Sequence, residues 1–303
     1  MGFRFFEKNK MRCLLCAGAC LLMMLFPDIT VNASKTAIRI WMNAVVPSLL
    51  PFMVIAGYIK RTGTKSIAGS PVYPVFMAFL SGYPMGAKLA GEYYRNGFVS
   101  EEGLRTLLYY AMITGPAFLL GGIGVTFYHT RMAGYILACS HYAGALTCGV
   151  IFGKKGCRSE KASLRAGASA GSFSDTPFTD CILESFRTLG IVLVYIVLFM
   201  IGTDFLDSMA CFQVLPEEAA AFGKGLLEMT VGCSGIAACS CSMQVKLILS
   251  SFIISFGGFS VIGQTMSMLS GCPVTFWNIL QIKLCHGMCS AIWTFMICTF
   301  VLS

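Results

Sequence analysis

Two glycine-broken stretches interrupt the otherwise continuous apolar pattern of this chain. The first places Gly82, Pro84 and Gly86 inside residues 71–97, and the second places Gly257 and Gly258 inside residues 245–270. Glycine costs about 1 kcal/mol and proline about 3 kcal/mol in a helix interior, so neither stretch favours one continuous helix. Each arm is about ten residues long, whereas crossing a bilayer takes about 20. We therefore predict two re-entrant helical hairpins, with 71–97 opening to the cytoplasm and 245–270 opening outward.

Apolar runs of helical length surround these stretches. They predict spanning helices at 34–61, 103–127, 132–153, 182–206 and 275–302, and a short retained helix within 1–30 that starts in the cytoplasm. The expected total is about six or seven spanning helices. A basic start before a short apolar run is also typical of a cleaved signal peptide, which is the alternative for 1–30. Segment 219–242 is only moderately apolar, so we expect it to enter the membrane partway or to lie at its interface.

Local signals refine these helices. Pro47 and Pro51 lie on one face of the helix at 34–61 and should bend or unwind it. Ser100 precedes two glutamates and should cap the helix that follows the first hairpin. The run Thr114-Gly115-Pro116 should interrupt that same helix near its middle.

The order of these elements indicates an internal repeat. Span 34–61, hairpin 71–97 and span 103–127 correspond to span 182–206, hairpin 245–270 and span 275–302. Because the two hairpins are expected to open in opposite directions, the halves would be inverted, which is a recurring transporter architecture. We therefore predict one transmembrane domain over 1–303. It comprises a first repeat at 31–153, a cytoplasmic linker at 154–181 and an inverted second repeat at 182–303.

Composition supports the membrane assignment. Only 12% of the residues are charged and 56% are hydrophobic, whereas a soluble domain carries about 25% charged residues. The sequence therefore predicts an all-α polytopic membrane protein. Sixteen of the 22 lysines and arginines fall in the segments assigned to the cytoplasm, and this asymmetry places the N-terminus there. The cations do not form a patch with interleaved aromatic residues, so we expect no nucleic-acid partner.

No catalytic or metal-binding pattern is recognisable. The 15 cysteines are scattered through apolar runs, and Cys13-x-x-Cys16 has no second pair or nearby histidine. The sequence contains no Walker loop that would cradle ATP phosphates. We therefore expect no metal, no cofactor and no enzymatic activity. A membrane enzyme would need polar catalytic groups clustered on one membrane face, and the sequence shows no such cluster.

Five motifs resemble a known family. They are Gly82-Tyr83-Pro84-Met85-Gly86-Ala87-Lys88, Thr114-Gly115-Pro116, His141-Tyr142-Ala143-Gly144, Phe256-Gly257-Gly258-Phe259-Ser260 and Lys283-Leu284-Cys285-His286-Gly287. Their order and spacing over residues 30 to 302 resemble the YlbJ-type sporulation integral membrane proteins. These proteins carry the nucleoside-recognition or Gate domain and are distantly similar to concentrative nucleoside transporters. The resemblance implies a helical-hairpin transporter that moves dipicolinate, an aromatic dianion, in the cell membrane or the outer forespore membrane. Met112-Ile113 and Ile262 depart from the family pattern and make the expected cavity more apolar.

The candidate substrate-binding residues follow from these motifs. Helix N-termini at hairpin tips attract carboxylates. An intramembrane cation such as Lys283 is a functional hypothesis by default, with snorkelling to the interface or a pair with Glu228 as the alternatives. Lys88 is a second candidate countercharge, with snorkelling to the interface as its alternative. His286 and His141 are candidate proton-coupling groups, with structural hydrogen bonding as the alternative. The full set of candidates is Gly82, Tyr83, Pro84, Gly86, Lys88, Gly115, Gly257, Gly258, Ser260, Gln264, Lys283 and His286.

Three classes of function are consistent with this sequence. The favoured one is a transporter of a small organic anion, coupled to an ion such as H+ or Na+, that works in contact with membrane lipid. A transporter of nucleosides or other small solutes is the alternative, and a non-transporting Gate-domain subunit of a larger complex is a further one. The sequence leaves the substrate, the coupling ion and the oligomeric state open.

Overall fold

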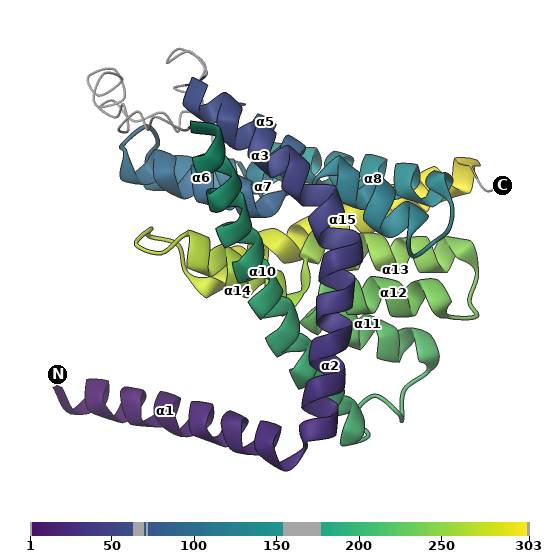
Figure 1. The fold of residues 1–303 in the computed structure, drawn as a ribbon. Helices are drawn as coiled ribbons and strands as arrows, with labels where there is room; N and C mark the ends of the chain where they lie inside the picture. Colours follow the sequence, from purple (N-terminus) through teal and green to yellow (C-terminus); the bar gives the residue numbers. More distant parts are fainter. Residues whose placement is uncertain (1, 63–69, 71, 154–176, 302–303) are drawn as a thin grey trace.

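The computed structural model describes residues 2–62, 70, 72–153 and 177–301, and within these ranges the chain forms helices and no β-strand. Figure 1 shows them as a bundle crossed on one side by two long helices. The predicted all-α class is therefore confirmed. Most of the predicted cytoplasmic linker, residues 154–176, lies outside the described residues.

The first helix, α1 (Gly2–Leu25), extends away from the bundle. A single break at Phe26 separates it from α2, and the Phe26 ring packs edge-on against Phe205. The apolar part of α1, Cys13–Leu25, is shorter than a membrane span. A short helix is therefore present within 1–30, as expected.

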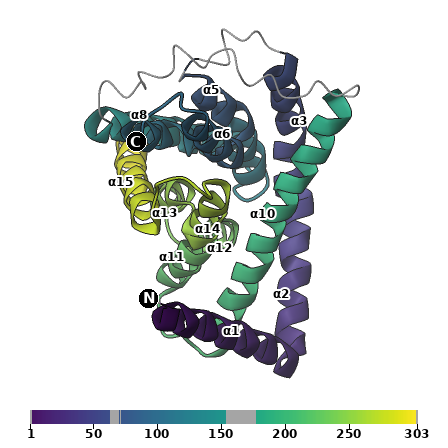
Figure 2. The ribbon, with the colours of Figure 1, turned by 90° about the vertical axis from the view of Figure 1, so that its left-hand side faces the viewer.

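Two long helices lie side by side along one face of the molecule (Figure 2). The first is built from α2 (Pro27–Ile40), the π-helical η1 (Trp41–Val45) and α3 (Val46–Thr62), and the second is α10 (Pro177–Ser208). The indole N–H of Trp41 donates to the Leu189 carbonyl at 3.1 Å and ties the two together. The bend predicted for the helix that contains Pro47 and Pro51 is visible between α2 and α3 in Figure 1. Helical geometry continues through the prolines, with one wider turn in η1 ahead of Pro47 and no unwound segment.

The first predicted hairpin is a pair of short helices, α5 (Val72–Ser81) and α6 (Tyr83–Arg95), that pack against each other across Gly82. Helix α7 (Glu101–Ala111) follows, and Ser100 caps it as predicted by accepting a hydrogen bond from the Gly103 amide at 3.0 Å. The predicted interruption at residues 114–116 separates α7 from the π-helical η2 (Phe118–Val125). Helix α8 (Arg131–Phe152) then crosses back.

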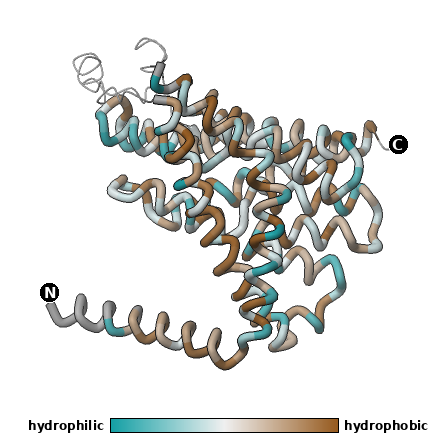
Figure 3. The backbone as a smooth tube through the Cα atoms, viewed as in Figure 1, coloured by the Kyte–Doolittle hydropathy of each residue, from teal (hydrophilic) through white to brown (hydrophobic). Residues whose placement is uncertain are grey.

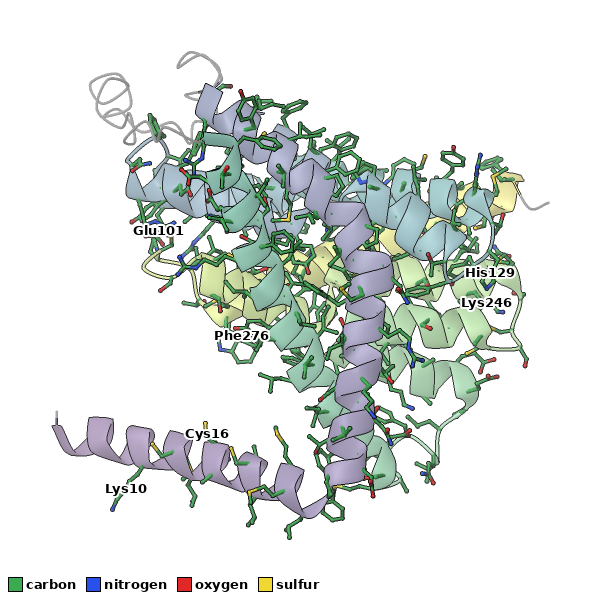
Figure 4. All side chains as sticks on the ribbon, viewed as in Figure 1. Lys10, Cys16, Glu101, His129, Lys246 and Phe276 are labelled. Carbon is green, nitrogen blue, oxygen red and sulfur yellow. The ribbon has the colours of Figure 1, made fainter. Side chains whose placement is uncertain are left out.

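The second half differs from the prediction. Residues 245–270 do not form a hairpin, because α13 (Met243–Phe256) and α14 (Gly258–Met268) continue from one end of the molecule to the other. The Lys246 carbonyl accepts a hydrogen bond from Tyr128, next to His129, whereas the Ser270 carbonyl accepts one from Arg95 at the opposite end. Figure 4 places His129 and Lys246 together, far from Glu101. Gly257 and Gly258 break this helix without reversing it.

The helices that fold back on each other in this half are α11 (Glu217–Leu227) and α12 (Met229–Ala238). Apart from the first two residues of α11, they lie inside segment 219–242, which was expected to enter the membrane partway or to lie at its interface. Glycines allow the close approach of the two arms, because a methyl group on Gly232 would lie 2.1 Å from the Gly225 Cα. The last helix, α15 (Phe276–Val301), matches the predicted final span.

Five helices in the described ranges are long and apolar enough to cross a membrane, which is fewer than the six or seven expected. Two predicted spans are absent from this set, because the apolar part of α1 is too short and because α7–η2 is interrupted. The broken helix Met243–Met268 is added to it. Figure 3 shows apolar positions along α10 and polar positions at the connecting turns. Exposed apolar side chains such as Leu198 and Phe295 cover the outer faces of α10 and α15, as expected for contact with lipid. The chain is a multi-pass membrane protein.

Candidate functional site

Three helix interruptions meet at the centre of the bundle. They are the turn at Gly82 between α5 and α6, the break around Gly115 between α7 and η2, and the turn at Glu228 between α11 and α12. Gly82 has a φ of +84°, a conformation that glycine adopts without steric cost. A methyl group on Gly115 would lie 3.3 Å from the Gly82 amide nitrogen. The two glycines therefore let the tip of one pair of helices pack directly against the break of another helix.

These interruptions surround a small central cavity. Its free volume is about 20 Å³, which is enough for roughly one water molecule. Side chains from α3, α6, α10, α12 and α14 contribute to its wall. The lining residues are Val45, Leu49, Gly82, Tyr83, Pro84, Thr114, Gly115, Phe118, Val192, Ile196, Glu228, Met229, Thr230 and Gln264. A solute larger than water enters only if the tips move apart.

A chain of hydrogen bonds crosses the cavity wall. The Tyr83 hydroxyl donates to Gln264 Oε1 at 2.9 Å, and Gln264 Nε2 donates to the Ser260 hydroxyl at 3.1 Å. All three side chains are buried. The bond between Tyr83 and Gln264 links the tip of α6 to α14, so it holds together two elements that would have to separate for a solute to pass.

Glu228 is the one ionisable carboxylate in the cavity wall. It is 1% exposed, and it caps α12 by accepting a hydrogen bond from the Val231 amide at 2.9 Å and another from the Thr230 hydroxyl. Glu228 is not among the candidate site residues that the sequence motifs predict. The signal was nevertheless present, since a lone acidic residue inside an apolar run is itself a functional hypothesis.

The break between α7 and η2 frees backbone groups that lipid cannot satisfy. His141 Nε2 accepts the Thr114 amide proton at 2.8 Å, and the Tyr142 hydroxyl donates to the Thr114 carbonyl at 2.9 Å. Lys283 Nζ donates to the Met112 carbonyl at 3.2 Å. The motifs that contain these side chains, His141-Tyr142 and Lys283, are therefore partners of one interrupted helix.

The two predicted histidines lie against each other, with ring centroids 4.5 Å apart. Because Nε2 of His141 accepts from an amide, its Nδ1 carries the proton and donates to the Ser255 hydroxyl at 2.7 Å. His286 Nε2 lies 2.9 Å from the His141 carbonyl oxygen and therefore donates to it. This geometry favours the structural alternative to proton coupling for both histidines.

The predicted site residues thus divide into three groups. Gly82, Tyr83, Pro84, Gly115 and Gln264 line the cavity, and Ser260 supports them through Gln264. The others contribute to packing, to helix breaks, to hydrogen bonds or to ion pairs outside the cavity lining.

Gly86, Gly257 and Gly258 are packing and break positions. A methyl group on Gly86 would lie 2.0 Å from the Ala111 carbonyl oxygen, and one on Gly258 would lie 3.0 Å from the Leu227 carbonyl oxygen. A methyl group on Gly257 would lie 3.2 Å from Lys283 Cε. These glycines let the broken helices pack at short distance.

The two lysines expected as countercharges lie outside the cavity lining. Lys283 is 1% exposed and points to the end of α7, where the carbonyl dipoles favour a cation. Lys88 lies about one turn beyond the tip of α6 and forms an ion pair with Glu184 on α10. Within the described part of the chain, no group of three or more metal-ligating side chains is present.

This fold and cavity define a multi-pass helical membrane protein whose helix breaks are buried together at its centre. Its sequence is 26% identical to the sporulation integral membrane protein YlbJ of Bacillus subtilis (strain 168), over 89% of this chain and 78% of that protein. The chain is therefore a distant relative of a YlbJ-type protein, and the resemblance predicted from the five motifs is confirmed. No protein-family model matches the chain, and no solved structure matches it.

Proposed function

We propose that this chain is a secondary transporter that carries a small organic anion across a membrane by alternating access, and that it is not an enzyme. The observation that carries the proposal is the convergence of three helix interruptions on one buried cavity. Irregular backbone persists at membrane depth where it is buried in protein or lines a cavity, and transporters bind substrates at such places.

The arrangement of the elements supports an inverted repeat. A long helix, a pair of antiparallel short helices, a broken helix and a straight helix occur in this order as α2–α3, α5–α6, α7–η2 and α8, and again as α10, α11–α12, α13–α14 and α15. At the open end of α5–α6, Arg95 donates to the Ser270 carbonyl. At the open end of α11–α12, the Ala237 carbonyl accepts from Lys246, which lies at the opposite end of the molecule from Ser270. We propose that both pairs are re-entrant hairpins, with the open end of α5–α6 facing the cytoplasm.

The helix N-termini at the cavity wall support an anionic substrate. Helix α6 begins at the cavity wall, and its N-cap residue Gly82 makes no side-chain cap. Pro84 has no N–H, so the amides of Tyr83 and Met85 are the ones that remain available in the first turn. The break at Gly115 presents the start of a further helical segment to the same space. The resemblance to YlbJ-type proteins makes dipicolinate the substrate to test first, and spore formation is the process named for the relative.

One observation favours a second candidate, a neutral solute such as a nucleoside. Glu228, Tyr83, Gln264 and Thr230 all line the cavity and form a set of hydrogen-bonding groups suited to hydroxyl and amide ligands. The carboxylate of Glu228 would repel an anion but would accept hydrogen bonds from a sugar hydroxyl. The two substrate classes therefore make opposite demands on the same residue.

Transport into proteoliposomes tests the proposal. The purified protein should accumulate radiolabelled dipicolinate faster than empty liposomes do, and faster than it accumulates uridine. Val192→Phe, which fills the cavity from α10, should abolish uptake, whereas Val194→Phe on the exposed face of the same helix should not. Size-exclusion profiles check that both variants fold. If the protein takes up uridine instead of dipicolinate, the second candidate is favoured. If it takes up neither solute, both candidate functions are contradicted.

A further inference from the structure

A second, open hollow lies beside the central cavity. Its volume is about 690 Å³, and its charged lining comes from α3, α6 and α10. We call it the vestibule and define it by the charged residues Arg61, Lys88, Arg95, Asp180, Glu184 and Arg187. It lies at the end of the molecule that the distribution of lysine and arginine predicts to be cytoplasmic.

The vestibule lies in line with the cavity along three helices. On α6, Lys88 lines the vestibule and Pro84 lines the cavity, and on α14 Met268 and Gln264 do the same. On α10 the pair is Thr188 and Val192. Positions four apart are about one helical turn apart, on the same face. The cavity and the vestibule therefore lie in series along one path, and about one helical turn of packed side chains closes the path between them.

Two interactions span this closed turn. The bond from Tyr83 to Gln264 joins α6 to α14, and the ion pair between Lys88 and Glu184 joins α6 to α10. Each of them ties α6 to a different neighbour. Separation of α6 from α10 would open the path and release Lys88 from Glu184 at the same time.

The charges of the vestibule are unbalanced. Its lining contains four cations and two carboxylates. Arg61 pairs with Asp180 and with Glu184, both at 3.3 Å, so these acids are already shared between Arg61 and Lys88. Glu184 in particular serves two cations.

The two remaining arginines carry the excess positive charge. Arg95 donates to the Ser270 carbonyl and to the Cys272 sulfur, which do not neutralise it. Arg187 is exposed and makes no ion pair or hydrogen bond within the described part of the chain. A hollow with one prevailing sign of charge concentrates ions of the opposite sign.

We propose that the vestibule is an anion-recruitment site, where Arg187 and Arg95 bind a small soluble carboxylate before it enters the central cavity. This inference rests on the proposed function for the direction of travel, but binding in the vestibule does not require transport. When the path opens, the ammonium of Lys88 exchanges Glu184 for the carboxylate of the solute. The phosphate of an anionic lipid headgroup shares the same chemistry, and the experiment separates the two sources.

A binding measurement tests the site without transport. Ser267 is exposed in the vestibule, so the Ser267→Cys variant of a cysteine-depleted chain should react with a maleimide. Millimolar dipicolinate should slow this reaction in detergent. Adding Arg187→Gln and Arg95→Gln should remove the protection, whereas Arg105→Gln should not, because Arg105 lies on α7 outside the vestibule and pairs with Glu101. Lack of protection by dipicolinate overturns the proposal, and so does protection by phosphatidylglycerol alone.

Transport kinetics give the second readout. In proteoliposomes, Arg187→Gln and Arg95→Gln together should raise KM for dipicolinate about tenfold or more with kcat unchanged, because each loses a charge-assisted contact outside the cavity. Arg105→Gln should leave KM unchanged. The salt dependence of kcat/KM should also become shallower in the double variant. If KM is the same in the double variant and in Arg105→Gln, the vestibule site is contradicted. If dipicolinate protects Ser267→Cys but the protein moves no solute, the site is supported and the proposed function is contradicted.

Discussion

Replacing His141 should reveal whether this buried histidine supports the break between α7 and η2 or carries a proton. Its Nε2 accepts the Thr114 amide proton at 2.8 Å, and the ring is 1% exposed. His141→Leu removes that acceptor and leaves a buried amide without a partner. His141→Gln places an amide oxygen close to the former Nε2 position, so it restores the acceptor without restoring a group that titrates near neutral pH.

The expected magnitude follows from the unsatisfied amide. An unpartnered buried amide costs about 1–3 kcal/mol. With an unfolding entropy of about 2 cal/mol/K per residue, the 303 residues give roughly 0.6 kcal/mol/K. His141→Leu should therefore lower Tm by about 2–5 °C, and His141→Gln should recover most of that loss.

Two measurements check this reasoning. Thermal unfolding in detergent can be followed with a thiol-reactive dye, because Cys148, Cys233 and Cys298 are buried and become reactive on unfolding. Uptake of dipicolinate driven by a pH gradient gives the functional readout. If His141→Gln keeps the parent Tm but abolishes only the gradient-driven component of uptake, His141 is a coupling group and the structural interpretation is wrong.

Three further changes test other parts of the structure. Gly86→Ala should destabilise the protein by about 1–3 kcal/mol or more in the same dye assay, since the methyl group would lie 2.0 Å from the Ala111 carbonyl oxygen, whereas Gly121→Ala has nothing within 4 Å and should be neutral. Tyr142→Phe should cost about 1 kcal/mol through its lost bond to the Thr114 carbonyl, and Tyr135→Phe on the exposed face of α8 should cost nothing. In intact cells that express a cysteine-depleted variant of the protein, an impermeant maleimide added outside should label Arg131→Cys and not Glu101→Cys. The reverse pattern would contradict the predicted orientation.

The positions of the glycine-containing helix breaks could be predicted from sequence, but their geometry could not. Gly82, Gly115 and Gly257 all disfavour a continuous helix, and the chain is interrupted next to each of them. Whether a break reverses the chain depends on tertiary packing. At Gly82 the arms fold back, whereas at Gly257 and Gly258 they continue, although both breaks contain glycine with positive φ.

The second hairpin was missed because its turn contains neither glycine nor proline. Glu228 occupies the turn, and the glycines that permit close packing, Gly225 and Gly232, flank it within the two arms. The roles of the motif residues also depended on three-dimensional contacts. Lys283 was expected to face an anion, yet its ammonium bonds to the Met112 carbonyl, which is far from it in sequence. Sequence periodicity carries no information about such long-range partners.

Glu228 offers the sharpest test of the charge of the substrate. Glu228→Gln keeps the shape of the side chain and an oxygen that accepts from the Val231 amide, so it changes mainly the charge of the cavity wall. At a separation of roughly 6 Å and an effective dielectric constant of about 20, the repulsion between two carboxylates is about 3 kcal/mol.

Removing that repulsion should tighten the binding of dipicolinate by up to about a hundredfold. A nucleoside whose hydroxyl groups donate to Glu228 should instead bind about tenfold more weakly, because a hydrogen bond to a charged acceptor is replaced by a neutral one. Isothermal titration of both solutes against the parent and Glu228→Gln distinguishes the two cases. Weaker dipicolinate binding by Glu228→Gln would show that the carboxylate assists the anion, through a shared cation or proton, and would refute simple repulsion.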